Sequence, residues 1–162
     1  MEDRDLGPLM HERAVKKQEE HVADALERGA TLLAGGARDP QGPLFYPATV
    51  LADVPTDALV FHEETFGPVA AIAPFDTEDE AVGIANATEY GLIAYVHSQD
   101  PRRIYRISRS LDFGMVAVNR TKVTGAPIPF GGMKQSGLAR EGSRHGLEAF
   151  TDIKYVCRDW SE

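Results

Sequence analysis

Residues 67–119 read GPVAAIAPFDTEDEAVGIANATEYGLIAYVHSQDPRRIYRISRSLDFGMVAVN, and three short apolar runs alternate there with two amphipathic stretches. The apolar runs predict strands at 67–75, 92–97 and 115–119. The amphipathic stretches predict helices at 78–88 and 101–111. Strands that alternate with helices favour parallel pairing, because a helical crossover returns the chain to the same end of the sheet. We therefore predict an α/β fold built on a parallel sheet.

Both predicted helices carry start signals. Thr77 and Glu80 fit the Ser/Thr-x-x-Glu capping box ahead of the first helix. Asp100 followed by Pro101 supplies an N-cap and a proline at the first helical position of the second. These signals place the helix starts more firmly than periodicity alone.

The flanking sequence extends this pattern in both directions. Residues 11–28 predict a helix with Val15, Val22 and Leu26 on one face, and Gly29 stops it. Before the central pattern we expect a strand at Thr31–Ala34, a loop at 35–47 and an extended segment at 48–51. After it we expect a long Gly- and Pro-rich segment at 120–142, a short helix near 143–149 and a last strand at Asp152–Arg158. That last strand lies at the terminus and must pair with something, of which another chain is one option.

The composition is that of a globular protein. The chain has 162 residues, of which 43% are apolar and 26% charged. Its longest apolar runs fall well short of the roughly 20 residues that span a bilayer, so we expect no membrane segment. The acidic start does not resemble a secretory signal, and the single cysteine excludes a disulfide framework. We therefore expect a cytoplasmic protein.

Charge is distributed unevenly. The net charge is −8, but residues 1–100 hold 6 basic and 19 acidic residues, a net of −13, whereas residues 101–162 hold 11 basic and 6 acidic, a net of +5. One interpretation is two solvated faces of one fold, and the other is a basic end that meets an anion or an acidic neighbouring surface. Nucleic acid is not expected as a partner, because no basic run is interleaved with aromatic residues.

Several standard sites are missing from the sequence. No G-x-G-x-x-G, Walker A, G-x-S-x-G or H-x-x-x-H pattern occurs, and we expect no metal site. The only thiol, Cys157, lies in an alternating apolar stretch, which is typical of a packed thiol rather than a nucleophile.

The stretch 62–68, His-Glu-Glu-Thr-Phe-Gly-Pro, is informative. If it is extended, Glu63 and Glu64 point to opposite faces, so only one of them can enter a site. A carboxylate there can accept hydrogen bonds from both hydroxyls of a ribose, and Phe66, two residues after Glu64, would pack against a flat ring. The alternative is a solvated acidic turn beside a core phenylalanine.

The stretch 127–137, Pro-Ile-Pro-Phe-Gly-Gly-Met-Lys-Gln-Ser-Gly, is the second informative one. Its prolines stiffen the chain and its paired glycines permit close approach of the backbone. It predicts either a rigid loop that presents Phe130 to an apolar pocket or an ordered structural crossover.

Together these stretches resemble the carboxyl-terminal part of the catalytic domain of an aldehyde dehydrogenase. The resemblance covers nearly the whole chain and rests on Leu6-Gly7-Pro8-Leu9, Gly29-Ala30, Gly35-Gly36, Glu63 to Val69, Ala85-Asn86, Tyr90-Gly91-Leu92, Val118-Asn119, Pro129 to Gly137 and Arg140-Glu141-Gly142. The ending, Ser136 to Cys157, is most similar to the succinate-semialdehyde dehydrogenase branch.

The resemblance implies an activity and a set of site residues. In this family a cysteine thiolate attacks the aldehyde, hydride passes to the nicotinamide of NAD or NADP, and water releases the acid; the choice between the two cofactors stays open. By resemblance, Glu64 holds the nicotinamide ribose, Phe66 packs near the nicotinamide, and Lys17 lies near the adenosine ribose. Thr124 and Phe130 correspond to walls of the aldehyde pocket, where the succinate-semialdehyde branch usually has serine in place of Thr124. We expect Glu64 and Phe130 to face one cleft.

The family's nucleophilic cysteine would lie upstream of these residues, and Cys157 does not align with it, so no catalytic residue is assigned. We expect residues 1–149 to be a partial catalytic domain, and residues 150–162 to be a terminal strand that joins subunits into a homo-oligomer. The chain is then a fragment of an enzyme for succinate semialdehyde or a similar semialdehyde, inactive alone and without strong nucleotide binding of its own. The alternative is a non-catalytic oligomerisation or interaction module.

Overall fold

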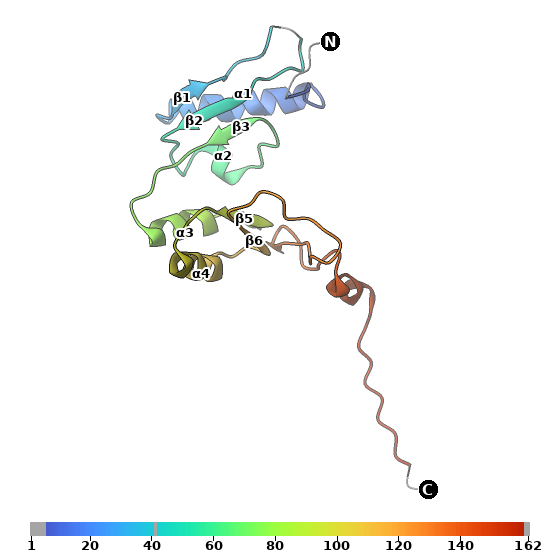
Figure 1. Ribbon diagram of the computed structural model, residues 1–162. Helices are drawn as coiled ribbons and strands as arrows, with labels where there is room; N and C mark the ends of the chain where they lie inside the picture. Colours follow the sequence, from blue (N-terminus) through green and yellow to red (C-terminus); the bar gives the residue numbers. More distant parts are fainter. Residues whose placement is uncertain (1–5, 41, 161–162) are drawn as a thin grey trace. The chain divides into compact units, whose positions relative to one another are not determined.

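The computed structural model describes residues 6–40 and 42–160, and these divide into two compact units on either side of the boundary between Ala81 and Val82 (Figure 1). Each unit is an α/β arrangement of its own. None of the helices among the described residues is long and apolar enough to cross a membrane.

The first unit packs one long helix against a small sheet. Its elements are α1 (Glu12–Glu27), β1 (Thr31–Ala34), β2 (Thr49–Ala52), α2 (Leu59–His62) and β3 (Val69–Ala71). The predicted helix 11–28 is confirmed: α1 ends at Glu27 with Arg28 as its C-cap, and Gly29 follows at φ +102°. Val15 and Val22 are buried as expected, but Leu26 is 38% exposed. The buried face of α1 instead includes two polar residues, Gln18 and His21.

The sheet of this unit is mixed rather than parallel, which corrects the expectation. β2 pairs with β3 in parallel and with β1 antiparallel, in the order β1-β2-β3. The reason lies in the connections. The described residues between β1 and β2, 35–40 and 42–48, include no helix, and β2 returns antiparallel beside β1, whereas the path from β2 to β3 passes through α2.

The core of the first unit lies between α1, the sheet and α2. Leu51 of β2 is fully buried and centres a cluster to which α1 contributes Val22 and Ala25. Val54 and Ala58, on the path to α2, complete its buried part together with Ala30. Burial of these apolar groups is the main stabilising contribution that holds α1 on the sheet.

The second unit contains the strand-helix-strand order that the sequence predicts. Helix α3 (Glu78–Asn86) spans the boundary between the units, and β4 (Tyr90–Gly91), β5 (Ile93–Val96), α4 (Pro101–Ser110), β6 (Met115–Val118), β7 (Met133–Lys134) and the 3-10 helix η1 (Arg144–Phe150) follow. β5 and β6 pair in parallel across the α4 crossover, as expected, while β4 and β7 form a separate antiparallel pair.

The predicted caps of α3 and α4 are present. Asp100 accepts the amide N–H groups of Arg102 and Arg103 at 2.9 and 3.3 Å. Thr77 Oγ1 accepts the N–H of Glu80 at 3.1 Å, and the Glu80 carboxylate accepts the N–H of Asp76 at 2.8 Å. The reciprocal arm of the capping box therefore reaches one residue further back than the motif predicts.

Two predicted strands differ from the structure. The strand expected at 67–75 is limited to β3. The strand expected at Asp152–Arg158 is absent, since residues 151–160 form neither helix nor strand and are exposed (Figure 1). A strand requires a hydrogen-bonding neighbour, and no described segment of this chain pairs with 151–160. The division into 1–149 and 150–162, and a role of the terminus in oligomerisation, stay predictions.

Asp24 ties α1 to α2. Its Oδ2 accepts the amide N–H of Leu59 at 2.8 Å, and its Oδ1 accepts Nε–H of Arg28 at 2.8 Å. Because both bonds favour the ionised carboxylate, they hold the pKa of Asp24 below its ordinary value.

Replacing Asp24 by asparagine should make stability less sensitive to acid. A carboxylate whose pKa is lowered on folding contributes stability above its unfolded pKa, about 3.9, and loses it as the pH falls through the folded pKa. In urea unfolding between about pH 6 and pH 2, the stability difference between wild type and Asp24→Asn should therefore shrink as the pH falls. Glu20→Gln, which removes an exposed carboxylate of the same helix, is the control. A difference that does not vary with pH would contradict the prediction.

Candidate functional site

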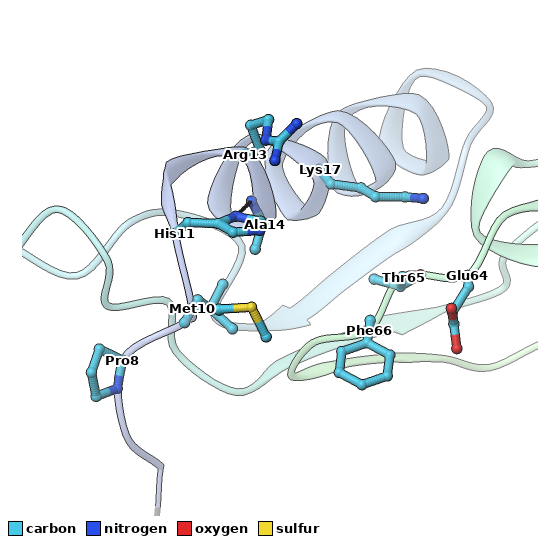
Figure 2. A pocket seen from close by; sticks show the side chains of 10 residues that line it. Pro8, Met10, His11, Arg13, Ala14, Lys17, Glu64, Thr65 and Phe66 are labelled. Carbon is cyan, nitrogen blue, oxygen red and sulfur yellow. Dashed lines mark hydrogen bonds between the residues drawn. The ribbon is translucent and has the colours of Figure 1, made fainter.

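A hollow of about 610 Å³ opens in the first unit where the start of α1 meets the segment after α2 (Figure 2). The two sides come from distant parts of the sequence and carry complementary charges. The lining residues are Pro8, Leu9, Met10, His11, Arg13, Ala14, Lys17, Glu64, Thr65 and Phe66. The structure thus brings together Lys17, Glu64 and Phe66, the three residues that the sequence singled out for a cofactor.

The segment 63–67 is held against α1 by a buried amide. Gln18 is fully buried, and its Nε2 donates to the carbonyl of Thr65 at 2.8 Å and to that of Ala14 at 3.2 Å. Gly67 passes directly over this side chain, and a Cβ atom there would lie well inside van der Waals contact with the Gln18 amide. Glycine at position 67 therefore allows the close approach that the Gln18–Thr65 bond requires.

Phe66 adopts an unusual backbone conformation. Its φ is +47°, in the left-handed region, which costs roughly 1–2 kcal/mol for a residue with a Cβ. The extended segment assumed from the sequence therefore ends in a turn at this residue. Its side chain is 77% exposed, so Phe66 is not the core phenylalanine of the alternative interpretation. In the view of Figure 2 the Phe66 ring and the Glu64 side chain project the same way from the segment.

The two adjacent glutamates have different surroundings. Glu63 Oε2 lies 3.3 Å from Lys17 Nζ and 3.5 Å from His21 Nε2, so its carboxylate faces α1. Lys17, and secondly His21, lower the pKa of Glu63. Glu64 lines the hollow, and Glu63 does not. Only one of the pair enters the site, as the alternation of side chains predicts.

Gln18 and His21 help to form the site but were not predicted from the sequence, and Glu63 was considered there only as the neighbour of Glu64. His21 is 1% exposed, and its Nδ1 lies 2.9 Å from Thr65 Oγ1. A signal for the first two was available, because Gln18 and His21 fall on the same helical face as Val15 and Val22, where polar residues need buried partners.

The hollow suits the ribose of a nucleotide. The Glu64 carboxylate can accept hydrogen bonds from two neighbouring hydroxyls, and the Lys17 ammonium can donate to an oxygen. The Phe66 ring and the apolar Pro8 and Leu9 offer surfaces for flat or apolar groups. Among residues 6–40 and 42–160, no group of three or more histidine, cysteine, aspartate and glutamate side chains is placed to hold a metal ion.

The two residues expected to bind the aldehyde lie in the second unit. Thr124 is exposed, and Phe130 is half-buried, with its N–H donating to the carbonyl of Glu141 at 2.9 Å. A hollow of about 580 Å³ near this loop is lined by Pro129, Leu138, Ala139, Arg140, His145, Glu148 and Ala149, and by neither of the two residues. Their roles, and a cleft shared by Glu64 and Phe130, stay predictions.

Lys134 has a structural role within the stretch 127–137. Its Nζ donates to the carbonyls of Asn86 and Thr88, each at 3.0 Å, and so binds the carboxyl end of α3. Those carbonyls lack partners within the helix, and a cation is favoured there. The crossover interpretation therefore holds for this part of the stretch.

Known proteins resemble the chain over most of its length. Residues 1–156 match the aldehyde dehydrogenase family. The chain is 53% identical over 151 residues to 3-sulfolactaldehyde dehydrogenase of Pseudomonas putida, covering 93% of this chain and 31% of that one. It is 50% identical over 151 residues to the mitochondrial succinate-semialdehyde dehydrogenase of Homo sapiens, covering 93% and 28%.

Solved structures agree with the sequence matches. The succinate-semialdehyde dehydrogenase of Burkholderia pseudomallei superposes with a TM-score of 0.92 at 47% identity, covering 98% of this chain and 33% of that one. Matching structures also include complexes with NAD+. The chain spans about a third or less of the length of the relatives it matches.

Gly67→Ala should destabilise the first unit through Gln18. The added methyl group displaces the buried amide and breaks its bond to Thr65, which costs about 1–3 kcal/mol. Gln18→Ala alone should cost a similar amount, but it clears the space, so the double variant should cost less than the sum of the two. Urea unfolding of the three variants measures this coupling. Gly83→Ala, where a Cβ meets nothing within 4 Å, is the control. Additive effects would show that position 67 and Gln18 do not compete for space.

Proposed function

The chain belongs to the aldehyde dehydrogenase family, and on that premise we propose that it is part of an NAD(P)-dependent enzyme that oxidises a semialdehyde to the carboxylic acid. The observation that carries the proposal is the gathering of Lys17, Glu64 and Phe66 around one hollow. These three side chains come from two segments some 50 positions apart and supply a cation, a carboxylate and an aromatic face.

In this proposal the first unit forms one wall of the cofactor site. When bound, the nicotinamide supplies the acceptor for the hydride removed from the substrate. Glu64 accepts hydrogen bonds from the hydroxyls of its ribose and so fixes the ring position, while Phe66 packs against a flat part of the cofactor. Lys17 donates from the other side of the hollow. NAD and NADP are both compatible with these residues, since neither Glu64 nor Phe66 distinguishes them.

The proposed substrate is an aldehyde that carries an acidic group. Both relatives, 3-sulfolactaldehyde dehydrogenase and succinate-semialdehyde dehydrogenase, are named for aldehydes of that kind. The positive net charge of residues 101–162 favours an anionic ligand. We assign Thr124, through its hydroxyl, and Phe130, through its ring, to the wall of the aldehyde pocket.

We propose that the 162 residues do not oxidise aldehydes by themselves. Their only thiol, Cys157, is exposed and follows η1 in a segment without secondary structure. A nucleophilic thiol needs a depressed pKa and a base within hydrogen-bond reach.

The cytoplasm stays the proposed location of the protein.

A chimeric enzyme tests this function. Residues 1–162 replace the matching third of the Burkholderia pseudomallei succinate-semialdehyde dehydrogenase, and reduction of NAD+ or NADP+ by a series of aldehydes is measured. We expect turnover with semialdehydes. Glu64→Gln should raise KM for the nucleotide about tenfold, because a neutral amide accepts the ribose hydroxyls less strongly, while KM for the aldehyde stays unchanged. Glu20→Gln is the matched control. A folded chimera that oxidises no aldehyde would contradict the proposal.

A second proposal, compatible with the first, is that the carboxyl-terminal segment serves association. Residues 151–160 expose Ile153, Tyr155, Val156 and Trp160, each at least 75% accessible, and several large exposed apolar side chains in one segment are typical of a contact surface. Sedimentation of the 162-residue chain should show dimers or larger species that increase with concentration. Replacing Ile153 and Tyr155 by serine should abolish them, and a wild-type chain that is monomeric at all concentrations would rule out this role.

A further inference from the structure

His21 contacts both neighbours of Glu64. Its Nδ1 lies 2.9 Å from Thr65 Oγ1, and its Nε2 lies 3.5 Å from Glu63 Oε2. The imidazole is 1% exposed and belongs to the buried face of α1. None of the roles proposed above uses this buried, titratable side chain.

The partners favour one arrangement of protons. Among the described residues Nε2 has no hydrogen-bond partner, and the nearest carboxylate oxygen, Glu63 Oε2, lies 3.5 Å away, so a proton on Nε2 directs a donor toward an acceptor. With the proton on Nε2, Nδ1 is an acceptor for the hydroxyl of Thr65. The result is a chain of polar contacts in which Thr65 donates to His21 and His21 faces Glu63.

We propose that His21 is the positioning residue of Glu64: it holds the side chains of both neighbouring residues, Glu63 and Thr65, and so sets the direction in which Glu64 meets the ribose of the cofactor. The inference rests on the proposed function for the identity of the ligand, but the positioning itself follows from the contacts of the first unit. His21 does not line the hollow, so it acts through its neighbours and is not a catalytic residue.

The segment 63–67 needs contacts that stabilise its conformation. Phe66 lies in the left-handed region, and a turn of that kind persists only where its surroundings determine it. Gln18 fixes the Thr65 carbonyl, and His21 fixes the Thr65 side chain and faces Glu63. Lys17, which lines the hollow, shares Glu63 Oε2 with His21, so the same carboxylate also steers the cation of the site.

Amide hydrogen exchange in the 162-residue chain tests the positioning directly. His21→Leu removes both polar contacts and should speed exchange at Glu64, Thr65 and Phe66 about tenfold relative to wild type. The helix amides around Ala25 report whether α1 still folds. His21→Gln, whose amide offers an acceptor and a donor, should restore most of the protection. His97→Leu, which removes an exposed imidazole from the second unit, should change nothing.

Thr65→Val provides a second variant of the same size in case His21→Leu does not fold. It removes only the hydroxyl partner of Nδ1 and should speed exchange of the same amides. Nitrogen chemical shifts of His21 should show the Nε2–H tautomer in wild type. Unchanged exchange at 64–66 in folded His21→Leu or Thr65→Val would overturn the proposal.

The chimeric enzyme separates this inference from the proposed function. His21→Leu should raise KM for the nucleotide about tenfold with kcat changed less than about twofold, and His21→Gln should recover KM. A merely structural role would lower the amount of active enzyme and leave KM alone. An inactive parent chimera contradicts the proposed function, while the exchange result still decides the positioning. If the chimera is active and the His21→Leu variant leaves its KM for the nucleotide unchanged, the positioning role of His21 is overturned and the proposed function is not.

Discussion

The site depends on the contact between the polar face of α1 and the backbone of residues 63–67. Gln18 and His21 are buried beside Val15 and Val22, where apolar residues would pack at no polar penalty. Their partners explain them: the Thr65 carbonyl and hydroxyl are held in a segment that no strand or helix organises. Regular elements satisfy their own backbone groups, whereas an irregular turn needs side chains from elsewhere to do so. Two buried polar residues on a helix therefore fix the shape of a loop that lines the hollow.

Glu63 and Glu64 show how adjacent identical residues acquire different tasks. The alternation of the backbone turns one toward α1 and the other toward the hollow. Glu63 is surrounded by Lys17 and His21, which favour its ionised form and lower its pKa. Lys17 in turn spans both environments, since it pairs with Glu63 and lines the hollow. The charge of Glu63 thus restrains the cation that lines the hollow, although Glu63 does not line the hollow itself.

The sequence predicted well what local chemistry decides. The caps at Thr77 and Asp100, the end of α1 at Gly29 and the parallel β5–β6 pair across α4 were all found because each depends on neighbours in the chain. Pairing between distant segments was less accessible. The antiparallel β1–β2 pair and the missing strand at 152–158 depend on which segment lies alongside, and no local pattern contains that information. Gln18 and His21 were missed because their partner, Thr65, lies more than 40 positions away.

The contacts that shape the hollow all lie within residues 8–67, inside the first unit. Their formation therefore requires only this unit to fold, with α1 docked on the sheet around Leu51 and Asp24 bonded to Leu59. In the proposed function, a wall held by contacts within the folded unit is in place before the cofactor binds, and such preorganisation reduces the entropy lost on binding. The left-handed turn at Phe66 fits this view, because its cost is met by folding rather than by the ligand. Stability of the small unit and affinity at the hollow are then linked, since both depend on the same few contacts between α1 and the segment 63–67.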